Sequence, residues 1–267
     1  MISLKKYSDI AHNILNNESR YKSNKNIIST LFNDSIKEGE IEVVKNRLTI
    51  IDCYYSTQMN KRLYGIEQMS ELLSCFSDID LQIELNQFLK SPKEGEIFDL
   101  FNIRYGLNKE GKSEKKAISL LSKYFYFLYN YSFPIYDSLA FDSYSLIKKN
   151  IDLPIVTLKE ENYFTSLIHL NTISGINNFE KLDNLLWLLG KLKKGSFSIL
   201  MNIEQYKRIT SIKEIVKGFE KINEGNNKNK SSLKDKVIRQ YIKNYYNKSE
   251  LFNVEEKHFF EFAFDLI

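Results

Sequence analysis

The residue with the clearest chemical potential is Asp137, in the segment FPIYDSLA (residues 133–140), where it follows Pro134 and begins a helical pattern. A carboxylate after a rigid proline, at a helix N-terminus, is held in place and kept ionised by the helix dipole. Such a group can stabilise a developing positive charge and orient an attacking water. Aspartate is also a preferred N-cap, worth about 1 kcal/mol. Catalysis and capping both fit Asp137, and one does not exclude the other.

Two lysines could supply an amine nucleophile. Lys116 stands beside Lys115 at the start of the apolar segment AISLLSKYFYFLYN (residues 117–130), and Lys123 lies inside it. An amine attacks carbon only when its pKa is lowered, by burial or by a cationic neighbour such as Lys115. Lys123 either extends its amine to solvent or pairs with a buried acid such as Asp183. The alternative for both is a solvated lysine.

Helices must position these side chains, because the composition favours helix throughout. The chain has 267 residues, 43% of them hydrophobic, with only 3 Pro and 10 Gly. Sheet signals are sparse, so an all-α fold is predicted. One amphipathic helix is predicted over residues 1–24, and segment 117–130, apolar all round, is predicted to be a central buried helix. Helical patterns continue in residues 211–225 and 235–246. Polar residues 223–236 are predicted to form a surface loop or, alternatively, an arm that contacts a nucleic-acid backbone.

Charge and composition narrow the classes of partner and cofactor. The formal net charge of +4 permits an anionic partner without requiring one. Cys53 and Cys75 are too few for a disulfide framework or a four-cysteine iron–sulfur site, and the three histidines are scattered, so no metal and no cofactor are predicted. The chain has no stretch of 18 apolar residues and no apolar run after its first residues. A cytoplasmic protein without a membrane partner is therefore expected.

Three stretches together resemble the helix–hairpin–helix DNA glycosylases of base-excision repair. LTIIDCYYSTQMNKRLYGIEQMSELL (residues 48–73) is similar to an early family helix that ends in a small-residue and Gln-Thr-type cluster. GKSEKKAISLLSKYFYFL (residues 111–128) resembles the family hairpin and the buried helix after it. FPIYDSLA resembles the catalytic segment. The resemblance covers about residues 40 to 145 and implies that Asp137 is the catalytic aspartate.

The chain also departs from the family pattern. Only Gly111 stands where the family hairpin usually has two glycines, and counting back from Asp137 without gaps puts Ser119 where lysine-using members carry their amine. Lys116 lies earlier and Lys123 one turn later, so both are retained as candidates. SKYFYFL, FPIYDS and the later KLDNLLWLLGK are also similar to uncharacterised bacterial proteins. This similarity places the chain on a remote branch.

The resemblance implies that a base is swung out of double-stranded DNA and held by side chains in a pocket. Tyrosines near the motifs could stack on the base, Gln58 could hydrogen-bond its edge, and lysines near the hairpin could contact phosphates. Aromatic residues at helical spacing more often belong to a core. The candidates for the base pocket or DNA are Tyr54, Tyr55, Gln58, Lys112, Lys115, Tyr136 and Trp187.

Two lobes with a cleft between them are the expected organisation: residues 1–39 with 138–267, and residues 40–137 with the hairpin. The leading hypothesis is a DNA glycosylase in which Asp137 stabilises the sugar cation while a modified or damaged base leaves, in DNA repair or phage defence. The first alternative is a non-catalytic DNA-binding module of the same fold. The second is a helical partner-binding protein of the phage-defence type.

Overall fold

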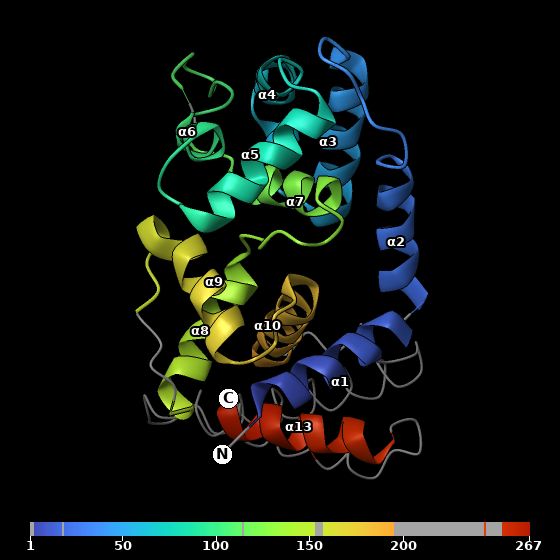
Figure 1. Ribbon diagram of the computed structural model, residues 1–267, viewed down its shortest axis with the longest axis vertical. Coiled ribbons are helices and arrows are strands. Elements are labelled where there is room, and N and C mark those ends of the chain that lie inside the picture. Colours follow the sequence, from blue (N-terminus) through green and yellow to red (C-terminus); the bar gives the residue numbers. More distant parts are fainter. Residues whose placement is uncertain (1–2, 18, 114, 153–156, 195–242, 244–252) are drawn as a thin grey trace, which may run out of the picture.

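The protein is all-α in its computed structural model (Figure 1), as predicted. The structure describes residues 3–17, 19–113, 115–152, 157–194, 243 and 253–267, and no strand occurs among them. The α-helices are α1 (Leu4–Asn17), α2 (Ser19–Thr30), α3 (Ile41–Tyr55), α4 (Gly65–Leu73), α5 (Asp78–Lys90), α6 (Glu96–Asn102), α7 (Ile118–Leu128), α8 (Ser138–Asn150), α9 (Tyr163–Ile173), α10 (Phe179–Lys193) and α13 (Val254–Leu266). The predicted helices in residues 211–225 and 235–246, and the polar stretch 223–236, lie outside the described residues, apart from residue 243.

The prediction of one helix over residues 1–24 is wrong. α1 ends at Asn17, α2 begins at Ser19, and the two run at a steep angle to each other (Figure 1). Asparagine and serine side chains compete for backbone hydrogen bonds and favour helix ends. The amphipathic pattern of α1 did not reveal this break, because apolar residues reappear at Ile27 and Ile28.

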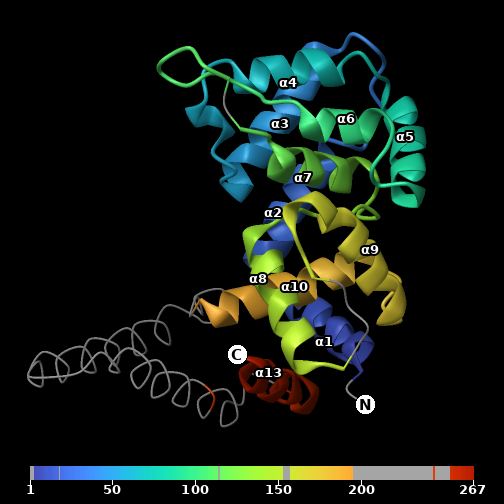
Figure 2. The same cartoon turned by 90° about the vertical axis from the view of Figure 1, so that its left-hand side faces the viewer.

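The helices gather in two groups, seen in both views (Figures 1 and 2). α3 to α7 form the upper group, and α1, α8, α9, α10 and α13 form the lower one, while α2 runs along their side. α1 packs against α10 and α13, and Tyr7 of α1 stacks on Phe262 of α13 at 3.8 Å between ring centroids. The predicted assignment of residues 1–39 and 138–267 to one lobe, and of 40–137 to the other, stays a prediction.

α7 is the buried centre of the upper group, as its sequence predicts. All residues from 120 to 128 are buried. Phe125 packs edge-on against Phe101 of α6 at 5.7 Å and against Phe133 at 5.8 Å. A helix surrounded on every side gives its polar residues no direct way to water. Lys123 is therefore enclosed by the fold.

A buried ion pair joins α3 to α5. Arg47 is 1% exposed, and its Nη1 donates to both carboxylate oxygens of Asp78 at 2.9 Å. Arg47 also donates to the carbonyls of Leu31 and Asp34, and Asp78 accepts from the backbone N–H of Ile36. Every strong donor and acceptor of the pair is satisfied, so the connection between α2 and α3 is held against the upper group.

The connection between α6 and α7, residues 103–117, folds back on itself as a hairpin. Backbone bridges join Arg104 to Lys116 and Leu107 to Ser113. Gly106 is left-handed (φ +78°), and a Cβ there would lie 2.7 Å from the Cβ of Arg62. Glycine is required at Gly106 because the segment around Arg62 approaches so closely. Gly111, at the tip of the hairpin, meets no such neighbour.

A second close approach locks α8 to α10. A Cβ added to Gly190 of α10 would lie 2.7 Å from the Cβ and 2.8 Å from the carbonyl oxygen of Leu139. Leu139 is in the first turn of α8, directly after Asp137 and Ser138. Direct contact between the helices at Gly190 thus fixes the start of α8 on the surface of α10.

No helix in the described part of the chain has the length and apolar character needed to cross a membrane.

Arg47→Met should lower the free energy of unfolding by about 3–5 kcal/mol, because it leaves the Asp78 carboxylate buried without its cation. Urea denaturation monitored by circular dichroism measures the change. Lys45→Met, on the same helix, is the matched control, since Lys45 is only half-buried and its Nζ lies 3.8 Å from Glu67 Oε1. It should change stability by less than about 1 kcal/mol. Equal losses in the two variants would contradict the role given to Arg47.

Candidate functional site

The segment before α8 is held from two sides. The backbone N–H of Tyr136 donates to Ser122 Oγ of α7 at 2.9 Å. On the other side, the Tyr163 hydroxyl of α9 donates to the carbonyl of Ile135 at 2.9 Å and accepts from the N–H of Asp137 at 3.4 Å. Phe133, Pro134 and Ile135 are buried. These contacts fix the position from which the Asp137 side chain extends.

The two carboxylate oxygens of Asp137 make different contacts. Its Oδ1 accepts the N–H of Leu139 at 2.7 Å, so it caps α8. Its Oδ2 lies 3.6 Å from the Nζ of Lys123. The side chain is 24% exposed, whereas that of Lys123 is 2% exposed. The cap immobilises the carboxylate, and the second oxygen faces the Lys123 amine.

Lys123 holds its amine at the boundary between the two groups of helices. Nζ donates to Ser119 Oγ, one turn earlier on α7, at 2.8 Å, and lies 3.4 Å from the carbonyl oxygen of Tyr136. It also sits 5.3 Å from the ring centroid of Tyr55 on α3. Nζ also lies 3.5 Å from the carbonyl oxygen of Ser119, so the amine is surrounded by one hydroxyl, two carbonyls, one carboxylate and an aromatic face.

Burial perturbs the protonation of this site. It lowers the pKa of Lys123, although the negative charges of Asp137 and Asp183 oppose the shift. Burial also raises the pKa of Asp183, on α10, to about 7; the charge of Asp137 adds to this, and Lys123 and Lys25 oppose it. Lys123 and Asp137 form what we call the carboxylate–amine cluster, and the charge of Asp183 acts on it. Opposed shifts of this kind in one place are typical of functional sites.

A cavity of about 670 Å³ adjoins this cluster. Its wall comes from α6, the hairpin, the start of α7 and the start of α9. Four cationic residues line it, against one acid, Glu161, so we call it the basic cavity. The cations are Arg62, Arg104, Lys115 and Lys116. The remaining wall is largely aromatic and aliphatic, as a pocket for a planar ligand would be.

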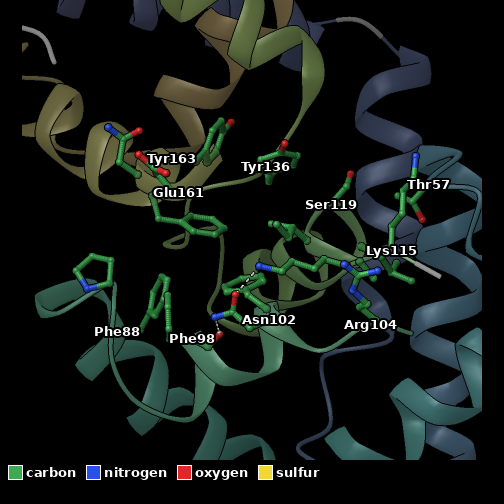
Figure 3. A pocket seen from close by; sticks show the side chains of 18 of the residues that line it. Thr57, Phe88, Phe98, Asn102, Arg104, Lys115, Ser119, Tyr136, Glu161 and Tyr163 are labelled. Atoms are coloured by element: carbon green, nitrogen blue, oxygen red, sulfur yellow. Dashed lines mark hydrogen bonds between the residues drawn. The ribbon is translucent and has the colours of Figure 1, made fainter. Parts of the chain in front are cut away.

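Ser119 and Tyr136 connect the cavity to the cluster. Both line the cavity, and both contact the Lys123 amine, through the Ser119 hydroxyl and the Tyr136 carbonyl. Figure 3 shows Ser119 and Tyr136 along one side of the cavity, with Tyr163 next to Tyr136. The ring centroids of Tyr136 and Tyr163 are 4.5 Å apart. The amine therefore does not line the cavity itself, but contacts two residues that do.

The hairpin lysines occupy different places. Lys115 and Lys116 are exposed and line the basic cavity, and Lys116 Nζ donates to Asn102 Oδ1 at 2.6 Å (Figure 3, dashed line). Lys112 lies near the hairpin tip, where it pairs with Glu110 at 2.8 Å, and it is not among the cavity-lining residues. Of the two lysines retained from the sequence, Lys123 is the one that contacts Asp137.

The polar cluster after α3 reaches the cavity through Thr57. Gln58 is exposed and left-handed (φ +63°), and Tyr54 is 40% exposed; neither is among the cavity-lining residues. Thr57 lines the cavity, and Asp52 accepts hydrogen bonds from its hydroxyl and from the N–H of Met59. Asp52 therefore shapes the turn that brings this cluster to the cavity.

Tyr55 and Trp187 lie away from the basic cavity. Tyr55 faces the Lys123 amine, and burial raises the pKa of its hydroxyl. Trp187 of α10 packs against Tyr21 at 5.6 Å between rings, and Lys191 Nζ lies 5.1 Å from its ring centroid. Tyr55 is thus placed to touch a reacting group at Lys123, whereas Trp187 packs between α10 and α2.

Sequence reasoning missed several residues of the site. Arg62 and Arg104 line the cavity, and Arg62 also donates to the carbonyl of Lys115 at 2.7 Å. Tyr163 anchors the Asp137 segment from a helix that was given no role. No sequence pattern marked Arg62, Arg104 or Tyr163, whereas the spacing of Ser119 and Lys123, four residues apart in an apolar helix, does put those two side chains on one face.

Within the described residues, no three His, Cys, Asp or Glu side chains gather where they could hold a metal ion. Cys53 and Cys75 are both free and exposed. Comparison with models of known protein families, with curated protein sequences and with solved structures finds no match to this chain. The site must therefore be interpreted from its own geometry.

Lys123→Met should raise the free energy of unfolding at pH 7 by about 1 kcal/mol. Methionine has a similar length and removes a buried ammonium whose ion pair with Asp137, its one such pair among the described residues, is 3.6 Å long. Stability kept low by a buried charge is typical of residues retained for function. Urea denaturation at pH 7 measures the change. A loss of more than 1 kcal/mol would instead make Lys123 a structural residue.

The stability of the wild-type protein should contain a contribution from Asp183 that falls as pH rises. The folded state holds the Asp183 proton up to a pKa of about 7, above the ordinary value of 3.8, so this contribution is complete below pH 4 and is lost on the way to pH 8. Asp183→Asn, which mimics the protonated acid, should reduce the loss by about 1–2 kcal/mol. Chemical denaturation of both proteins at several pH values measures this difference. Parallel plots of unfolding free energy against pH for wild type and Asp183→Asn would contradict the raised pKa of Asp183.

Proposed function

We propose that the protein is a DNA glycosylase-like N-glycosyl hydrolase that removes a modified or damaged base. The proposal rests on the different contacts of the two carboxylate oxygens of Asp137. One oxygen is fixed as the cap of α8, and the other faces a buried amine at 3.6 Å. A fixed and ionised carboxylate beside a potential nucleophile is what cleavage of a bond to an electron-poor sugar carbon requires.

The reaction follows from charge. As the N-glycosidic bond lengthens, its electron pair leaves with the base, and positive charge develops on the sugar. Asp137 stabilises that charge, as carboxylates do in sugar hydrolysis. Water attacking the sugar carbon loses a proton and leaves a hydroxyl there. If the neutral Lys123 amine attacks instead, the nitrogen forms the new bond and the ring-opened sugar becomes an imine.

The basic cavity supplies the electrostatics for DNA. Arg62, Arg104, Lys115 and Lys116 come from two segments that are brought together by the bridge between Leu63 and Leu107. Cations clustered on one wall attract phosphates through counterion release, which makes binding dependent on salt. The aromatic wall with Tyr136 and Tyr163 suits a base that has left its stack.

A non-catalytic DNA-binding module is the second candidate. It is favoured by the enclosure of Lys123, whose side chain is 2% exposed, because the cations of the cavity wall do not need that amine to bind phosphate.

A partner-binding protein is favoured by a different surface. Ile79 and Ile83, one turn apart on α5, are 62% and 51% exposed.

Asp137→Asn should abolish base release while leaving DNA binding within about threefold of wild type, because asparagine keeps the cap of α8 and removes the charge. Base release is measured on duplexes that carry one modified base each, by strand scission after alkali. Asp142→Asn is the matched control, since Asp142 is a half-buried acid on the same helix that pairs with Lys194 at 3.7 Å. It should leave base release unchanged.

Gel-shift titrations at several salt concentrations separate the candidates. Salt-dependent binding without base release by the wild type would support the non-catalytic module. If the protein bound neither duplex, mismatched nor abasic DNA, both DNA-binding candidates would be excluded and the partner-binding candidate would remain. Equal base release by wild type and Asp137→Asn would exclude Asp137 as the catalytic acid.

A further inference from the structure

Ser119 links the Lys123 amine to the basic cavity. It is the second residue of α7, is half-buried and lines the cavity (Figure 3). Its Oγ accepts a hydrogen bond from Lys123 Nζ at 2.8 Å, the shortest polar contact of that amine with the described residues. No acceptor for the Ser119 hydroxyl hydrogen lies in the described part of the chain. The hydroxyl is therefore in contact with the amine and also available to a ligand in the cavity.

The Lys123 amine is placed to act as a base toward this hydroxyl. A serine becomes a nucleophile when a neighbouring base takes its proton, and a neutral lysine amine is one such base. Burial lowers the pKa of Lys123, although the charges of Asp137 and Asp183 oppose the shift. Tyr55, whose ring faces the amine, stays neutral near pH 7 because burial raises the pKa of its hydroxyl. The amine therefore becomes neutral at a lower pH than an exposed lysine does.

α7 begins beside the same hydroxyl without a capping side chain. Its N-cap is Ala117, which has no side-chain oxygen, and the N–H of Ser119 has no acceptor among the described residues. Ala117, Ile118 and Ser119 all line the basic cavity. Free N–H groups and the helix dipole stabilise negative charge at a helix start. An oxyanion formed on a carbonyl group that Ser119 attacks can accept this N–H, as backbone donors allow in acyl transfer.

We infer that Ser119 and Lys123 form a nucleophile–base pair that cleaves an anionic ester bound in the basic cavity. The class of substrate follows from charge and size. Arg104, Lys115 and Lys116 are exposed cations of the cavity wall, and they favour an ester that also carries a negatively charged group. The volume of about 670 Å³ suits a small molecule.

The reaction balances with water as the only co-reactant. Ser119 Oγ attacks the ester carbonyl carbon while its proton passes to the Lys123 amine. When the tetrahedral intermediate collapses, the bond to the alcohol oxygen breaks, the alcohol takes the proton from Lys123, and the acyl group stays on Ser119. Water then attacks the acyl carbon and gives its proton to Lys123, which returns it to Ser119 as the carboxylic acid leaves.

This activity goes beyond the proposed removal of a base and does not depend on it. The reactivity of Ser119 is measured without DNA, whereas base release is measured on duplexes, so either can fail while the other holds. Asp137→Asn separates them within one variant. It is expected to abolish base release, but labelling of Ser119 should persist and shift to lower pH, because loss of the carboxylate charge lowers the pKa of Lys123 further.

A fluorophosphonate reagent with a carboxylate tail tests the pair, because it forms a covalent adduct with activated serine hydroxyls. Mass spectrometry of peptides locates the adduct, which should lie on Ser119. The labelling rate should rise about tenfold per pH unit until Lys123 is neutral, and Lys123→Met should slow labelling by about 100-fold or more. Ser145→Ala is the control, since Ser145 is an exposed serine of α8, and it should leave the rate unchanged.

Three results would overturn the inference: no adduct on Ser119 at any pH, equal labelling of the wild type and Lys123→Met, or a rate that does not change with pH. Circular dichroism checks that Lys123→Met is folded, and if it is not, the pH profile of the wild type decides. The same reagent with an uncharged tail should react about tenfold more slowly. Equal rates for the two reagents would exclude an anionic substrate.

Discussion

The site depends on a lysine amine placed inside an apolar helix, where water cannot solvate its charge. Lys123 is surrounded by α7, α3 and the segment before α8. Among the described residues, its polar contacts are the hydroxyl and carbonyl of Ser119, the Tyr136 carbonyl and the Asp137 carboxylate. A buried ammonium is tolerated when nearby negative charge offsets its loss of hydration. The elements that hold Asp137 beside Lys123 therefore supply the nearby negative charge.

The helices that present these groups are stabilised by interactions distant from the site. Arg47 and Asp78 hold the segment after α2 against α3 and α5, which surround α7. Tyr163 attaches the Asp137 segment to α9 through its hydroxyl. The reactive groups themselves contribute little stabilisation. Packing between helices and the Arg47–Asp78 ion pair thus stabilise the fold, which offsets the cost of burying Lys123.

The helical class, the burial of α7 and the N-cap position of Asp137 were predictable from sequence, because each follows from local periodicity or local residue preference. The break between α1 and α2 was not, since its only sign was a short polar stretch between apolar residues. The contact between Lys123 and Asp137 joins residues 14 positions apart, and sequence alone left Lys116 equally suitable. Arg62 and Arg104 meet at the cavity only because Gly106 admits a close backbone approach, which is a property of tertiary structure.

The tight contact at Gly190 bears on how the protein can move. α8 cannot slide along α10 without a clash at Leu139, so the two helices must travel as one rigid body. The chain before α8 contains two consecutive left-handed residues that are not glycine, Asn130 (φ +47°) and Tyr131 (φ +64°), a backbone geometry that stores strain. Between these residues and α8, Phe133 packs against Phe125 of α7 and the Tyr136 N–H donates to Ser122 Oγ. Any swing of α8 and α10 about Asn130 and Tyr131 would therefore have to break these contacts first.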